Sequence, residues 1–162
     1  MGKVLALLIC GLTLASCAAN RKAVWTGLDT LSAASLLASE ITRGQWLEES
    51  GRLDDSPVLV IAQGEDLSGA SLPLAGIRKE LIRQILASGM LRLVLAETEA
   101  FEPAALASDS GADAVLFWQA KPGPRKKDHL YWFDLRIVGA EDGRILHAAR
   151  LAYPQPGYKA KG

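Results

Sequence analysis

The sequence has 162 residues with 18 basic and 18 acidic side chains, so its formal net charge is zero, and it lacks the overall positive charge that is typical of nucleic-acid-binding domains. Its two cysteines, Cys10 and Cys17, both lie near the N-terminus, which excludes a disulfide framework or a cysteine-rich zinc motif in the rest of the chain. The residues after Cys17 are numerous enough for one domain with a hydrophobic core.

The first residues have the pattern of a secretion signal. Lys3 supplies a positive charge, and residues 4–14 form a mostly apolar run that has the length of a signal peptide. The next positions, Leu14-Ala15-Ser16-Cys17, resemble the lipobox of bacterial lipoproteins. This resemblance implies cleavage between Ser16 and Cys17 and a covalent lipid on Cys17. We therefore expect a signal peptide over residues 1–16 and a lipid-anchored mature chain.

Residues 17–28 are predicted to be the lipidated cysteine and a short tether. Ala18 occupies the position where an Asp retains many Gram-negative lipoproteins in the inner membrane, so we expect the periplasmic face of the outer membrane. The residues of the tether reach about 40 Å when fully extended, which is short for contact with an inner-membrane protein. Trp25, close to the lipid, is expected at the membrane interface.

Three helices are expected. Asp29 or Thr30 is predicted to cap the first, which runs to about residue 49 and is weakened by Gly44. The second is predicted over residues 74–88, with Gly89 as its C-terminal cap. A short third helix is predicted over residues 103–110. Apolar residues recur at helical spacing in the first two.

Five strands are expected, and residues 154–162 are predicted to be a flexible tail. Strands joined by helices pair in parallel with right-handed crossovers, and the Asp-Gly turn at residues 142–143 is typical of a hairpin. The predicted fold of residues 29–153 is therefore α/β (α+β): a single mixed sheet of about five strands, helices packed against it, and an antiparallel C-terminal hairpin. The predicted strands are residues 58–62, 91–95, 114–119, 130–138 and 144–153.

Three segments carry a resemblance to a known family. They are PVLVIA with the later IRKELIRQILASGMLRLV, then GADAVL at residues 111–116, and DLRIVGAEDGRIL at residues 134–146. Together they resemble the LpoB-like lipoproteins that activate penicillin-binding proteins, and the wider group with a similar α/β domain that includes the N-terminal domain of TolB and the curli lipoprotein CsgG. The resemblance implies a periplasmic domain that binds another protein, in LpoB a peptidoglycan synthase, and that catalyses no reaction.

The sequence offers little catalytic chemistry. His129 and His147 are the only histidines, and they lack the cysteines or the His-x-x-x-His spacing of a zinc site. We expect His129 in a loop and His147 half-buried in a strand. No Gly-x-Ser-x-Gly motif is present, and the polar residues 64–69 lack the pattern of a phosphate or calcium loop. We therefore expect no catalytic residue, no metal and no cofactor beyond the lipid on Cys17.

Candidate partner-binding residues lie in the last strands. Trp132 is predicted on the polar face of its strand with Asp134 and Arg136, and Trp and Arg are enriched at binding hot spots. The alternative is that Trp132 packs under a helix. Trp118 is a second candidate anchor. A basic turn could contact anionic headgroups or an acidic partner, or could be a solvated hairpin tip; it comprises Lys121, Arg125, Lys126 and Lys127.

The predicted function is that of a membrane-anchored periplasmic lipoprotein. It acts as a protein-binding module without catalytic activity, and its partner is a cell-envelope protein such as a penicillin-binding protein. The alternative is a structural subunit of a cell-envelope or secretion assembly. An enzyme is the least favoured interpretation.

Overall fold

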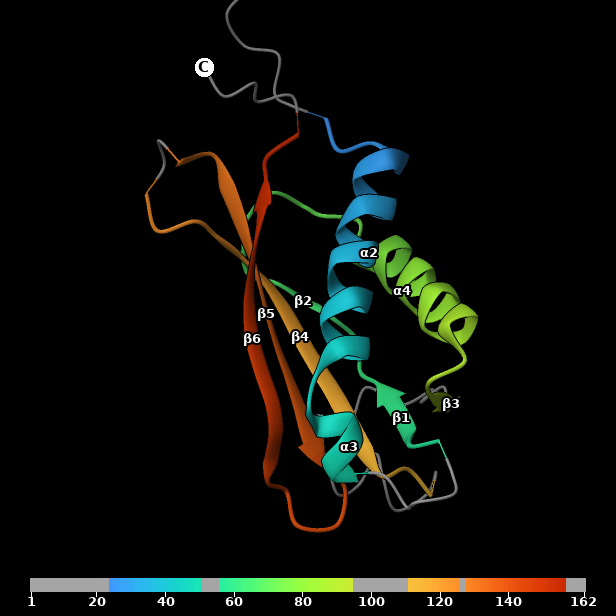
Figure 1. Ribbon diagram of the computed structural model, residues 1–162. Coiled ribbons are helices and arrows are strands. Elements are labelled where there is room, and N and C mark those ends of the chain that lie inside the picture. Colours follow the sequence, from blue (N-terminus) through green and yellow to red (C-terminus); the bar gives the residue numbers. More distant parts are fainter. Residues whose placement is uncertain (1–23, 51–55, 95–110, 126–127, 157–162) are drawn as a thin grey trace, which may run out of the picture.

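The computed structural model describes residues 24–50, 56–94, 111–125 and 128–156, in which the long helices cover one face of a mixed sheet (Figure 1). The strands lie in the order β3-β1-β4-β5-β6, and β2 pairs separately with β4. The elements are α2 (Gly27–Arg43), α3 (Trp46–Ser50), β1 (Val58–Ile61), β2 (Glu65–Asp66), α4 (Leu74–Ser88), β3 (Arg92–Val94), β4 (Ala114–Pro122), β5 (Leu130–Gly139) and β6 (Ile145–Pro154).

The sheet is parallel at one side and antiparallel at the other. Strand β1 pairs in parallel with β3 and β4, whereas β4, β5 and β6 form an antiparallel series. This confirms the predicted mixed sheet with an antiparallel C-terminal hairpin. Strand β2, the one strand beyond the five predicted, was expected to be part of a polar loop. It pairs with Gln119 and Ala120 of β4 through two acidic residues, which carry no hydrophobic pattern that could predict a strand.

Helix α2 begins earlier and ends sooner than its pattern predicts. Thr26 is the N-cap, and its hydroxyl and backbone N–H form a reciprocal capping box with Asp29, so the predicted cap at Asp29 or Thr30 is wrong. The helix ends at Arg43 because Gly44 adopts an extended backbone. The chain then turns Trp46 into the core, where its indole N–H donates to the Ile41 carbonyl at 2.9 Å. One predicted helix is therefore two.

Helix α4 has the predicted bounds and the predicted cap. Gly89 adopts a left-handed conformation with φ of 66°, and its N–H donates to the carbonyl of Leu86. Because glycine has no Cβ, this conformation carries little strain and closes the last turn of the helix.

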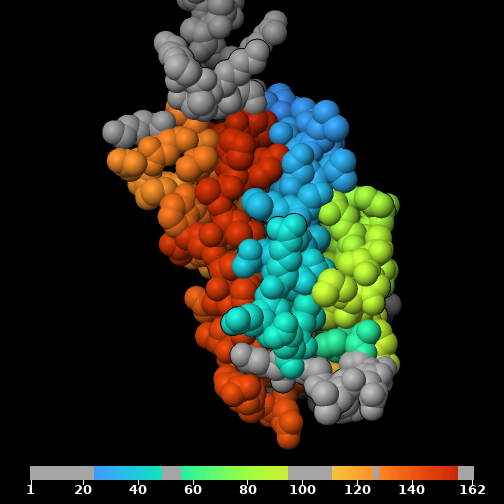
Figure 2. Space-filling model, in the orientation of Figure 1, coloured from blue at the N-terminus to red at the C-terminus, as the bar shows by residue number. Residues whose placement is uncertain are grey.

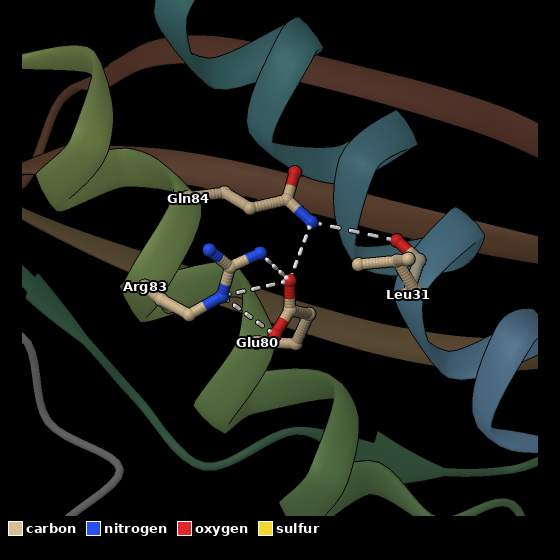
Figure 3. A network of polar contacts seen from close by, with 4 residues as sticks. All are labelled: Leu31, Glu80, Arg83 and Gln84. Carbon is tan, nitrogen blue, oxygen red and sulfur yellow. Dashed lines mark hydrogen bonds and ion pairs between the residues drawn. The ribbon is translucent and has the colours of Figure 1, made fainter.

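A polar network joins α4 to α2 across their outer surface (Figure 3). The Gln84 amide donates to Glu80 at 3.0 Å and to the backbone carbonyl of Leu31 in α2 at 3.5 Å. Arg83 also pairs with Glu80, and its hydrogen bonds, followed by that of Gln84, lower the pKa of Glu80 to about 2. The two helices lie side by side over the sheet (Figure 2).

The hydrophobic core lies between the helices and the sheet. Its largest members are fully buried and come from both the helices and the strands. No polar or charged residue of the described ranges is buried. A smaller cluster of Val60, Ala62 and Val115 lies on the other face of the sheet. The largest fully buried side chains are Trp46, Phe133, Leu37, Ile41, Leu59, Ile61, Ile77, Leu81, Ile85, Leu116, Leu135 and Ile137.

Several predicted features lie outside the described residues. They are the signal peptide over residues 1–16, the lipidated Cys17, the tether up to residue 23, the helix over residues 103–110 and the tail from residue 157. In the part of the chain that is described, no helix combines the length and apolar character needed to cross a membrane.

Candidate functional site

The candidate site lies on the open face, which we define as the side of β4, β5 and β6 turned away from α2 and α4. Side chains alternate between the two faces of a strand. In β5, Phe133, Leu135 and Ile137 are buried in the core under the helices, which places Trp132, Asp134 and Arg136 on the open face. This confirms the predicted separation of the apolar and polar faces of β5.

Asp134 is the centre of a cross-strand cluster on the open face. The sheet register places it between Gln119 of β4 and Arg150 of β6. Arg150 contacts its carboxylate through two nitrogens, at 2.5 and 3.0 Å, in the bidentate geometry that makes such pairs strong. Lys121 donates to the carboxylate at 3.1 Å and Gln119 at 3.5 Å. One carboxylate of β5 therefore holds side chains from both neighbouring strands, β4 and β6.

These contacts alter the titration of the carboxyl group. The hydrogen bonds from Arg150 contribute most and are opposed by burial, and Lys121 adds to them, so that the pKa of Asp134 falls from its ordinary value of 3.8 to about 2. Asp134 is thus negatively charged throughout the physiological range. It fixes the positions of two basic side chains on an otherwise exposed surface.

Trp132 packs against Arg150 and belongs to the same group of side chains. The guanidinium carbon of Arg150 lies 4.6 Å from the centre of the indole ring, a cation–π arrangement. The indole Nε1 is buried and donates no hydrogen bond. A buried donor without an acceptor costs about 1–3 kcal/mol relative to a satisfied one, so this atom gains from any acceptor that reaches it. We refer to Gln119, Lys121, Trp132, Asp134 and Arg150 as the Asp134 cluster.

A groove of ≈ 520 Å³ borders the Asp134 cluster. Arg136 lines it and is exposed, and among the described residues its guanidinium has no ion pair or hydrogen bond. The Asp134 carboxylate, in contrast, is occupied by two cations. The groove therefore offers the positive charge of Arg136 beside the apolar side chains of Phe117 and Val138, with the acidic Glu65 also in its lining. Its other lining residues include Gln63, Glu65, Phe117, Val138, Gly143 and Ile145.

Trp118 contributes to the lining of the groove, but its side chain is directed into the core and is not an exposed anchor. It is only 4% exposed and packs in the core with Leu116 and Ala120, its even-numbered neighbours on the helix-facing side of β4. Its indole N–H donates to the carbonyl of Ala62 at 3.2 Å. Alternation along β4 separates the two faces, but only the placement of the helices shows which face is the core.

The basic turn is divided between several environments. Lys121 belongs to the Asp134 cluster, whereas Arg125 is exposed and pairs with Asp128 at 3.0 Å. Lys126 and Lys127 lie outside the described residues. The cluster member that sequence reasoning missed is Arg150. The position of the Asp-Gly turn could have found it, because a hairpin closed there brings residues near 150 opposite Asp134.

The histidines lie apart from the open face. His147 is half-buried in β6, as predicted, and its Nε2 lies 3.0 Å from Glu40 of α2. His129 precedes β5, as predicted for a loop residue, with a positive φ of 47°. In the ranges that the structure describes, no three His, Cys, Asp or Glu side chains come together as a metal site would require.

Comparison with known proteins identifies the fold. No family model and no curated protein matches the sequence. Among solved structures, the C-terminal domain of LpoB from Escherichia coli is 14% identical, with a TM-score of 0.59 over 76% of this chain and 98% of that domain. The same domain from Salmonella enterica is 15% identical, with a TM-score of 0.57 over 76% and 96%. The chain therefore has an LpoB-like fold, as the sequence resemblance implies.

Proposed function

We propose that this LpoB-like domain is a lipid-anchored module of the cell envelope that binds another protein through its open face and catalyses no reaction. The observation that carries the proposal is the open face itself. It presents Arg136, which has no ion pair among the described residues, in a groove of mixed lining, beside a Trp132–Arg150 stack held by Asp134. Tryptophan and arginine dominate the binding energy of protein interfaces, and this pair is ordered before a partner arrives.

The chemistry of the face indicates what the partner presents. Arg136 calls for a carboxylate on the partner. Phe117 and Val138 form apolar walls of the groove. A loop or helix end with one acidic residue beside an apolar side chain meets these requirements.

The sequence supports a location for this protein and a class of partner for it. The lipobox at residues 14–17 supports acylation of Cys17 and retention at the periplasmic face of the outer membrane. The likeness to LpoB in segments and fold supports a peptidoglycan synthase of the penicillin-binding type as the partner. In this proposal the domain regulates the synthase by contact and needs no cofactor besides its lipid.

Site-specific photo-crosslinking in living cells tests the proposal. A photoreactive amino acid replaces Ala148, an exposed residue of β6 that pairs with Arg136, in the full chain, and membranes are then labelled with fluorescent penicillin, which marks penicillin-binding proteins covalently. A fluorescent band shifted upward by the mass of this protein supports the proposal. The matched control carries the same amino acid at Lys79, an exposed basic residue of α4 on the other side of the sheet. Absence of any crosslinked protein at Ala148 would contradict binding through the open face.

A second candidate function, a structural subunit, is favoured by one observation. Strand β6 has ten residues and lies at the edge of the sheet, where only β5 pairs with it among the described strands. An unpaired edge can accept a strand from another chain. In the same experiment, crosslinks only between copies of this chain, with no penicillin-labelled product, would favour the structural subunit.

A further inference from the structure

Exposed apolar side chains gather at the first turns of α2. Val24 is 77% exposed and Leu28 is 75% exposed, and Leu31 follows one turn later at 40%. Farther along the outer side of the same helix the exposed residues are small and polar, as at Ser32 and Ser35. We call Val24, Leu28 and Leu31 the apolar end patch. It is confined to the end of the helix where the chain enters the domain.

This end of α2 is fixed to the rest of the domain. Trp25 does not extend into solvent with its neighbours but packs on Tyr131 and Tyr153, with ring centroids 5.9 and 5.4 Å apart. Its indole N–H donates to the Thr30 hydroxyl at 2.9 Å, and the hydroxyl of Tyr153 donates to the Asp29 carbonyl at 3.2 Å. The start of α2 thus lies beside the start of β5 and the end of β6 (Figure 1). The apolar end patch therefore has a fixed orientation relative to the rest of the domain.

The chain before the patch is short. Residues 17–23 connect Cys17 to Val24, and they include Arg21 and Lys22. Fully extended, this segment spans about 25 Å. An acylated Cys17 therefore holds the apolar end patch next to the bilayer, and the two basic residues between them favour anionic headgroups.

We propose that the apolar end patch docks on the lipid surface that holds the anchor. This inference rests on the lipid anchor of the proposed function. A second copy is a poorer occupant, because three side chains provide far less than the roughly 1,200 Å² that a stable protein interface buries. Docking also orients the groove. Gly143 and Ile145, which line it, lie at the β5–β6 turn at the end of the domain opposite the start of α2 (Figure 1), so docking holds this part of the groove away from the membrane.

Spin labelling of the full chain tests this orientation. Acylation blocks Cys17 and cleavage removes Cys10, so a cysteine introduced by Leu28→Cys is the single free thiol. The matched control is Leu86→Cys, another exposed leucine, near the far end of α4. Both proteins are purified from membranes with their lipid and reconstituted in vesicles of phosphatidylethanolamine and phosphatidylglycerol. Collision of the label with oxygen and with a water-soluble nickel chelate is then measured.

The proposal predicts that the label at residue 28 is shielded from nickel severalfold relative to residue 86, because a polar nickel chelate is excluded from the apolar part of a bilayer and oxygen is not. A label at Leu31→Cys gives the same result, and adding Leu28→Ser reduces the shielding. Equal nickel access at residues 28 and 86 in protein that floats with the vesicles overturns the inference and leaves the anchor intact. Spin–spin broadening at residue 28 shows a second copy there and also overturns it. Failure to float overturns the anchor, and the inference with it.

Discussion

The two faces of the antiparallel sheet differ in what holds their side chains in place. Under the helices, Phe133, Leu135 and Ile137 are almost completely excluded from water and are positioned by close packing. On the open face one residue away, Trp132 and Asp134 are positioned by Arg150 and Lys121 across the strands. The same strand thus carries a packed face and a charged face.

Stability and recognition should therefore be separable in this domain. Burial of apolar area dominates folding free energy, so changes on the covered face should unfold the protein. Ion pairs at a surface contribute little to stability but fix the direction of charged groups. Changes on the open face should therefore alter binding in a domain that remains folded.

The largest effect is expected for Phe133→Ala. Phe133 is fully buried and its ring meets that of Tyr153 edge-on at 6.1 Å. Loss of such a ring leaves a cavity and lowers the free energy of unfolding by about 3–5 kcal/mol. Urea unfolding followed by circular dichroism measures it. A loss below about 1 kcal/mol would contradict the covered face as the source of stability.

Gly64→Ala should have the next largest effect. A Cβ at this position would lie 2.4 to 2.7 Å from three ring carbons of Trp118, so the indole must move in a packed core. Overpacking of this kind costs about 1–3 kcal/mol, seen as a lower urea midpoint. The control is Gly27→Ala, where nothing lies within 4 Å; it should leave stability unchanged or raise it slightly. Equal stability of the two variants would contradict the tight contact with Trp118.

Asp134→Asn should have a smaller effect that depends on pH. Surface ion pairs contribute about 1 kcal/mol or less, so the loss at neutral pH should be of this size. The folded pKa of about 2 lies below the ordinary 3.8, so the contribution is present above pH 4 and is lost as the pH falls through 2. Urea unfolding at pH 6, 4 and 2 should show the difference between wild type and variant disappearing at the lowest pH. A constant difference would show that the charge of Asp134 is not its cause.

Arg136→Glu should affect stability least. The side chain is exposed and has no charged partner among the described residues, so the free energy of unfolding should change by less than about 0.5 kcal/mol. Crosslinking to the partner from a neighbouring open-face position, Ala148, which pairs with Arg136, should nevertheless be lost. Lys79→Glu makes the same charge change on α4 and should leave the crosslink intact. An unchanged yield with Arg136→Glu would remove Arg136 from the proposed interface.

Local sequence patterns predicted much of the fold because they reflect interactions between residues that are close in the sequence. The spacing of apolar residues in α4 and the glycine that follows it were sufficient for both ends of that helix. Alternation in β5 was sufficient to separate Asp134 and Arg136 from Phe133. The end of α2 was missed because Gly44 can weaken a helix or end it, and the outcome depends on where Trp46 finds a buried site.

The sequence by itself determined which residues share a face, since side-chain direction follows from the repeat of a helix or strand. Tertiary structure decided which face is covered. Trp118 and Trp132 are both aromatic strand residues, yet the indole of one faces the core and donates to the Ala62 carbonyl, and that of the other lies under Arg150, because α2 and α4 cover one face of the sheet. The Asp134 cluster likewise depends on the register of three strands, which long-range pairing sets and no local pattern contains.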